Sequence, residues 1–93
     1  MPKTIIRTAM AGTMESCDAL VTVSPQTVGQ GLELELTSSV QKQYGKQIQK
    51  LAAQTVLQEG YSDVKMTIND KGAWEYTLIA RIKAALARGG AAQ

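Results

Sequence analysis

Three segments of the chain alternate between apolar and polar positions with the two-residue period of a half-buried β-strand. They are residues 17–24, which are rich in β-branched side chains, residues 32–36 with the sequence Leu-Glu-Leu-Glu-Leu, and residues 63–69. Pro25 and a glycine-containing stretch separate the first two segments. We therefore expect three strands, with 17–24 and 32–36 paired as an antiparallel hairpin.

A fourth segment repeats apolar positions every three or four residues, which is typical of an amphipathic helix. It begins at Ser38 or Ser39 and ends at Gly60, a residue type that often follows a helix. The side chains expected on its core-facing side are Val40, Tyr44, Ile48, Leu51 and Thr55.

The last patterned segment follows a turn signal at residues 69–72 and fits two structures. The apolar positions of residues 74–82 match a strand or a helix equally well, but the Ala, Arg and Lys content of residues 79–88 favours a helix. Trp74 is expected to anchor this helix onto the sheet. A stacking platform made of Trp74 and Tyr76 is the alternative.

The resulting order, β-β-α-β-α, is typical of an α+β fold with a three-stranded sheet and two helices on one face. We expect one domain over residues 1–93, with residues 1–12 as a loose N-terminal arm and residues 89–93 as a frayed tail. Residues 1–13 do not fit a secretory signal, and no run approaches the roughly 20 apolar residues that span a bilayer. A cytoplasmic protein is the expectation.

The composition removes several classes of chemistry. The chain has no histidine and one cysteine, which excludes histidine-based catalytic triads, histidine-ligated zinc and an internal disulfide. The net charge of +2 is too small to indicate nucleic-acid or membrane binding. Glu33 and Glu35 share the solvent side of a predicted strand, and no pair of carboxylates suggests acid–base catalysis. We therefore predict no catalytic residue and no metal site, and hence not an enzyme by itself.

Residues 11–18 concentrate the remaining chemistry, because they hold a glycine, two hydroxyls, two carboxylates and the only thiol. Ser16 lies between Glu15 and the Cys17-Asp18 pair, so a separate enzyme could modify its hydroxyl if the segment is mobile. The alternative is a polar loop in which Ser16 and Asp18 bond to the local backbone. Cys17 is interpreted as a small residue beside the modified one.

Three motifs in order resemble the acyl carrier (gamma) subunit of citrate lyase. The likeness covers roughly residues 9–88, and it depends on the combination, since any single motif would be weak. The motifs are Ala11-Gly12-Thr13-Met14-Glu15-Ser16-x-Asp18, Ser38-Ser39-Val40-x-Lys42-Gln43-Tyr44-Gly45 and Asn69-Asp70-Lys71-Gly72-Ala73.

This resemblance implies a carrier with Ser16 as the attachment residue. In that family the matching serine holds phosphoribosyl dephospho-CoA through a phosphodiester, and the thiol of this arm carries acetyl. A transferase (alpha) subunit exchanges acetyl for citrate, and a lyase (beta) subunit releases oxaloacetate, so that citrate becomes acetate and oxaloacetate in anaerobic citrate breakdown. Glu15 and Asp18 are expected to be recognised by the enzyme that attaches the arm.

A small α+β binding module, such as a KH-like nucleic-acid or protein binder, is the alternative function. A KH clamp needs a G-x-x-G loop beside basic residues, and no pair of glycines here has that spacing. Lys42, Lys46 and Lys50 recur every four residues, which describes either a solvated helix face or a surface for an acidic partner or for the phosphates of the arm.

Overall fold

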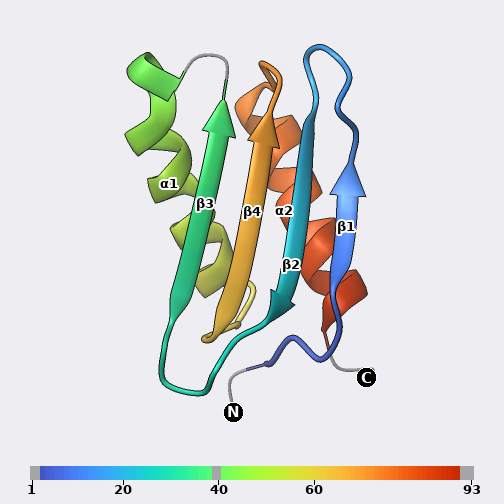
Figure 1. Cartoon of the computed structure of the whole chain (residues 1–93), viewed down its shortest axis with the longest axis vertical. Helices are drawn as coiled ribbons and strands as arrows, with labels where there is room; N and C mark the ends of the chain where they lie inside the picture. Colours follow the sequence, from blue (N-terminus) through green and yellow to red (C-terminus); the bar gives the residue numbers. More distant parts are fainter. Residues whose placement is uncertain (1–2, 39–40, 91–93) are drawn as a thin grey trace.

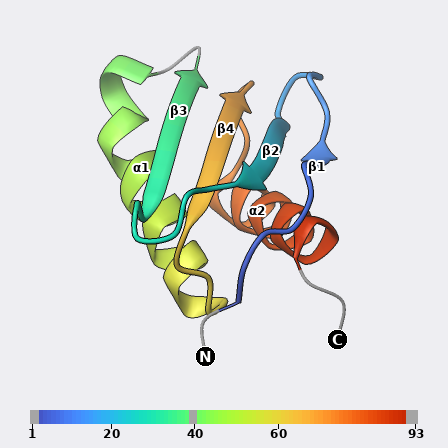
Figure 2. The same ribbon diagram turned by 60° about the horizontal axis from the view of Figure 1, so that its bottom comes forward.

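The computed structural model describes residues 3–38 and 41–90, apart from the side chains of residues 41–43. Strands and helices follow in the order β1 (Ala9–Gly12), β2 (Ala19–Pro25), β3 (Leu32–Ser38), α1 (Gln41–Gln58), β4 (Val64–Asp70) and α2 (Glu75–Gly89). The strands form one sheet in the order β1-β2-β4-β3 (Figure 1). Both helices lie on the same side of this sheet (Figure 2), as the sequence predicted.

The core lies between the sheet and the helices. Alternate residues of the two central strands are fully or almost fully buried, and α2 contributes one apolar stripe against them. This arrangement accounts for the two-residue period of the strands and the longer period of the helix. The central residues are Val21, Val23, Val64, Met66, Ile68, Leu78, Ile82 and Leu86.

The prediction of three strands is wrong, because the sheet has four. The additional strand, β1, comes from residues 1–12, which were expected to be a loose arm. It pairs antiparallel with β2, with Ala9 opposite Val23 and Gly12 opposite Leu20. Before it, Ile5 is only 4% exposed. The sequence shows no strand pattern here, because Arg7 and Thr8 interrupt the apolar residues and β1 itself is made mostly of small residues. The strand is buried by its contacts with β2 and α2, which no local pattern reveals.

The expected hairpin of residues 17–24 and 32–36 is also wrong. β4 lies between β2 and β3, antiparallel to β2 and parallel to β3. The parallel neighbours β3 and β4 are joined through α1, as parallel strands require a long crossover. Alternation predicts which face of a strand is buried, but it carries no information about which strand lies beside it.

The helices correct further expectations. Residues 75–89 are helical, so the ambiguity at 74–82 resolves as predicted. Gly60, with φ +86°, follows α1 as expected. Trp74 does not anchor the helix, because it is 66% exposed, and Tyr44 is 48% exposed and not a core residue. Val40 lies outside the described residues. No helix within residues 3–38 and 41–90 is long and apolar enough to cross a membrane.

The prediction of a frayed tail over residues 89–93 is wrong for Gly89 and Gly90. Gly89 ends α2, both glycines are buried, and the carbonyl of Gly89 accepts hydrogen bonds from the amides of Ile6 and Arg7. A Cβ at position 89 would lie 2.9 Å from the carbonyl oxygen of Arg7. The absence of a side chain therefore lets the start of the chain pack closely on this helix end, while residues 91–93 are outside the described part.

Candidate functional site

The loop that joins β1 to β2, residues 13–18, holds all three predicted site residues: Glu15, Ser16 and Asp18. It lies at the same end of the sheet as the turn after β4 and the first turn of α1 (Figure 1). Ser16 is exposed, and its hydroxyl makes no hydrogen bond with any described residue. The hydroxyl is therefore open to solvent, although the hydrogen bonds described below hold its loop in place, unlike the mobile segment that the sequence suggested.

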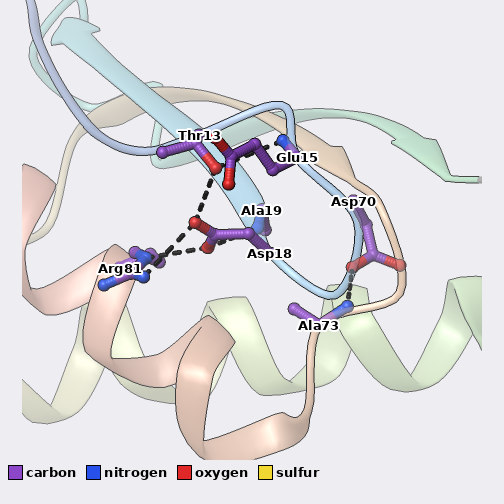
Figure 3. Close-up of polar contacts among 7 residues, drawn as sticks. All are labelled: Thr13, Glu15, Asp18, Ala19, Asp70, Ala73 and Arg81. Atoms are coloured by element: carbon purple, nitrogen blue, oxygen red, sulfur yellow. Dashed lines mark hydrogen bonds and ion pairs between the residues drawn. The ribbon is translucent and has the colours of Figure 1, made fainter.

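Asp18 anchors this loop to α2. Its Oδ1 accepts a hydrogen bond from Arg81 Nε at 2.9 Å and its Oδ2 accepts one from Arg81 Nη2 at 3.3 Å. The Thr13 hydroxyl and the Ala19 amide also donate to this carboxylate, at 2.8 and 2.7 Å (Figure 3). The side chain of Asp18 is only 13% exposed. An attaching enzyme that bound the Asp18 carboxylate would therefore have to compete with four hydrogen bonds within the chain.

These hydrogen bonds determine the charge of Asp18. The Arg81 guanidinium, then the Thr13 hydroxyl and then the Ala19 amide hold the pKa of the Asp18 carboxyl well below its ordinary value of 3.8. All three stabilise the ionised form, and burial, a smaller effect, opposes them. Asp18 is consequently an anion at any physiological pH.

Backbone hydrogen bonds fix both sides of Ser16. The amide of Glu15 donates to the Thr13 hydroxyl at 3.2 Å, and the amide of Asp18 donates to the Glu15 carbonyl at 3.3 Å. The amide of Cys17 donates to the carbonyl of Lys71 at 2.8 Å, and the amide of Lys71 donates to the carbonyl of Asp18 at 2.9 Å. Ser16 therefore projects from an ordered loop that is bonded to the turn after β4.

Two positions of this loop region have a positive φ. Gly12 has φ +97°, and a Cβ there would overlap the carbonyl oxygen of Ala19, so this close turn requires glycine. Cys17 has φ +64° and is the only non-glycine residue with positive φ among the described residues. An L-residue pays roughly 1–2 kcal/mol in this conformation, so the small Cys17 is held there by its surroundings.

A groove of about 400 Å³ lies between α1 and the start of α2, and the turn after β4, to which this loop is hydrogen-bonded, forms part of it. Its wall includes the turn after β4, where the Asp70 carboxylate accepts hydrogen bonds from the Ala73 amide at 3.0 Å and the Ser38 hydroxyl at 2.8 Å (Figure 3 shows the first). The lining residues are Tyr44, Gln47, Ile48, Leu51, Asp70, Gly72, Ala73, Trp74, Glu75 and Leu78.

Sequence reasoning missed two parts of this site. Arg81 lies outside the three motifs, and its pairing with Asp18, 63 positions away, has no local signal in the sequence. The sequence predicts Tyr44 on the core-facing side of its helix and Trp74 as an anchor on the sheet, whereas both line the groove. In the described part of the chain, no group of three His, Cys, Asp or Glu side chains could hold a metal ion.

Comparison with known proteins supports a common ancestry over nearly the whole chain. Residues 6–89 match the family model described as malonate decarboxylase delta subunit (MdcD). The chain is 45% identical over 84 residues to the citrate lyase acyl carrier protein of Clostridium perfringens, covering 90% of this chain and 82% of that protein. It is 43% identical over 79 residues to the protein of the same name from Fusobacterium nucleatum, covering 85% and 83%.

A solved structure has the same fold. It is described as a Pseudomonas malonate decarboxylase hetero-tetramer in complex with malonate, and one of its chains matches with a TM-score of 0.79. The match covers 95% of this chain and 91% of that one. At 20% sequence identity, this likeness shows a shared fold and nothing more about chemistry.

Proposed function

This chain belongs to the family of citrate lyase acyl carrier proteins, and on that premise we propose that it is the carrier subunit of a citrate lyase with Ser16 as its attachment residue. Proteins of this name are non-catalytic carriers, so the chemical steps belong to other subunits. The observation that carries the proposal is the exposed Ser16 hydroxyl on an ordered loop.

The arm that Ser16 would hold is phosphoribosyl dephospho-CoA, attached through a phosphodiester. The site suits such a group, because the hydroxyl is exposed and makes no hydrogen bond that attachment would break. When bound, this group supplies a thiol that carries acetyl or citryl as a thioester. The chain's own contribution is to keep the attachment point exposed and in one place, which raises the local concentration of the acyl group at each partner site.

The partners of this carrier would be the alpha (acyl transferase) and beta (lyase) subunits, which convert citrate to acetate and oxaloacetate. The enzyme that attaches the arm would be a further, transient partner. The cytoplasm is the proposed location, since a lone cysteine beside the attachment residue suits a reducing compartment.

Glu15 and Asp18 take different roles in this proposal. The Glu15 side chain is exposed and makes no hydrogen bond or ion pair within the described residues, so its carboxylate is available to the attaching enzyme. The Asp18 carboxylate is occupied by Arg81, Thr13 and the Ala19 amide. Asp18 therefore acts as a positioning residue that gives the loop its shape.

Malonate decarboxylase is the second candidate complex, because the matching family model and the solved structure carry that name. The relatives that share 40% or more of this sequence are named for citrate lyase, and for that reason we prefer citrate. The acid that is consumed when the loaded carrier is combined with its own partner subunits distinguishes the two.

Intact mass spectrometry of the chain from its native host, followed by peptide mapping, tests the attachment. The expected result is an added mass equal to phosphoribosyl dephospho-CoA on the peptide that contains Ser16. Ser16→Ala should abolish the addition, whereas Ser62→Ala, at another exposed serine, should leave it intact. An unmodified chain from cells that are cleaving citrate would overturn the proposal.

A further inference from the structure

The groove between α1 and the start of α2 presents aromatic side chains to the solvent. Trp74 is 66% exposed and Tyr44 is 48% exposed, although aromatic side chains are usually among the most buried. They line the groove together with the apolar side chains of Ile48, Leu51 and Leu78. The volume of about 400 Å³ lies in the range of small-molecule sites. The groove is thus built for a flat, largely apolar group.

The polar side chains of the groove indicate which flat group fits. No lysine or arginine is among the lining residues, so the groove does not select phosphates or a citryl carboxylate. The Asp70 carboxylate already accepts hydrogen bonds from the Ala73 amide and the Ser38 hydroxyl. Besides the Tyr44 hydroxyl, Gln47 and Glu75 are the polar side chains that remain. An amide side chain can pair with both N6 and N7 of adenine, while a carboxylate accepts from an N–H donor. The chemistry therefore favours a neutral purine with an exocyclic amine.

The position of the groove indicates where such a base would come from. One wall is the turn after β4, and the amide of Cys17 bonds to the carbonyl of Lys71 in that turn at 2.8 Å. Ser16 directly precedes Cys17 in the chain. A group tethered to Ser16 is consequently held beside the groove at high effective concentration.

We propose that this groove binds the adenine base of the arm on Ser16, with the base stacked on the Trp74 ring. The inference rests on the proposed function, because it needs a nucleotide-containing arm at Ser16. In phosphoribosyl dephospho-CoA the phosphoribosyl end joins the protein and the thiol is at the far end, so the nucleotide lies between them. Docking the base holds the near half of the arm still and leaves the thiol-bearing half free to visit the partner sites.

Tryptophan fluorescence tests this proposal directly, because Trp74 is the only tryptophan. A tether supplies a millimolar effective concentration, which would half-fill a site of millimolar affinity. Because a base stacked on the indole quenches its fluorescence, we expect the arm-bearing chain to lose roughly half of the fluorescence of Ser16→Ala. In the Tyr76→Ala variant, which changes an exposed aromatic residue outside the groove, the same loss should remain.

Titration of free nucleotide into the unmodified chain tests the groove without the tether. Dephospho-CoA and AMP should shift the amide NMR signals of Gly72 and Ala73 in a saturable way, whereas pantetheine should not. Trp74→Ala should remove these shifts, and Tyr76→Ala should keep them. Shifts caused by pantetheine and not by AMP would overturn the assignment of the base.

The outcomes separate this inference from the proposed function. If mass spectrometry finds the arm on Ser16 but the fluorescence and the Trp74 indole signal match those of Ser16→Ala, the groove proposal fails and the carrier function stands. If AMP has no effect but the partner subunits protect Trp74 from solvent, the groove is a protein-docking surface and the proposal is wrong. If no arm is found, the free-nucleotide titration still decides whether the groove binds a purine.

Discussion

Arg81 and Asp18, 63 positions apart in the sequence, form the ion pair that fastens the serine loop to α2, with Nε and Oδ1 2.9 Å apart. The guanidinium contacts both carboxylate oxygens, and such paired hydrogen bonds fix orientation as well as distance. The Thr13 hydroxyl joins the same carboxylate from the other end of the loop. The placement of Ser16 therefore depends on a helix that is far from it in the sequence.

Acid should release this loop in a defined range of pH. The pKa of the Asp18 carboxyl is lower in the folded chain than its ordinary 3.8, so its contribution to stability is complete above that value and is lost as the pH falls towards the folded-state pKa. We expect Asp18→Asn to be less stable than the parent at pH 7 and to lose less stability between pH 4 and 2. Thermal unfolding followed by circular dichroism measures both effects.

Asp63 provides the control for this pH dependence. Its pKa is also lowered, by hydrogen bonds from the amides of Gly31 and then Gly29, and it lies in a different part of the chain. Asp63→Asn should therefore reduce the acid sensitivity without changing the loading of Ser16. If Asp18→Asn kept the full acid sensitivity of the parent, the ion pair with Arg81 would not contribute to folding.

Gly12→Ala should be strongly destabilising, because the turn into the serine loop has no room for a side chain. The backbone at Gly12 has φ +97°, and a Cβ there would overlap the carbonyl oxygen of Ala19. The expected loss is about 2–4 kcal/mol in the free energy of unfolding, measured by urea denaturation. Gly29→Ala is the matched control, because Gly29 has φ +88° but open space around it, and its loss should be only about 1 kcal/mol.

Much of this fold was predictable from local patterns. Val21, Val23, Val64 and Ile68 are all buried, as the alternation in their segments indicated, and the Ala-, Arg- and Lys-rich residues 79–88 are helical. Burial on one face imposes a period that can be found in a single sequence. The strand β1 and the insertion of β4 between β2 and β3 could not be found in this way, since both depend on contacts between distant segments.

The candidate site also has one part that local sequence could predict and one part that depends on contacts between distant segments. The three loop residues Glu15, Ser16 and Asp18 are close in sequence and could be named from a motif. The pairing of Asp18 with Arg81 spans nearly the whole chain, and the exposure of Trp74 depends on how α1 and the start of α2 meet. A large aromatic residue beside a helix usually packs in the core, and that general tendency produced the wrong expectation for Trp74.

Cys17 should be replaceable, and glycine should improve the fold. Its φ of +64° is unfavourable for any residue with a Cβ, so we expect Cys17→Gly to raise the free energy of unfolding by roughly 1 kcal/mol. Met14→Gly, in the same loop but without a positive φ, should lower it by about 0.5–1 kcal/mol.

Cys17→Ser should load with the arm and carry acyl groups as the parent does. Loss of acyl loading with the arm still attached would instead give the thiol a chemical role.

Glu15 should matter for attachment of the arm and not for folding. Its exposed carboxylate has no partner among the described residues, so Glu15→Gln should leave the melting temperature within about 2–4 °C, as for other exposed surface changes. If the attaching enzyme recognises this charge, the rate of attachment should fall on the order of tenfold. Glu33→Gln, an exposed carboxylate on β3, is the control and should load at the parental rate.

A comparison of Asp18 with Arg81 decides whether Asp18 shapes the loop or is itself recognised. If Asp18 is a positioning residue, Asp18→Asn and Arg81→Ala should slow attachment by similar factors, on the order of ten- to a hundredfold, because each releases the same loop. Arg81→Lys should be intermediate, since it keeps the charge and loses the paired hydrogen bonds. If the attaching enzyme binds the Asp18 carboxylate directly, Arg81→Ala would uncover it and attachment would be as fast as in the parent, while Asp18→Asn would remain slow. Single-turnover loading measured by mass spectrometry separates these two outcomes.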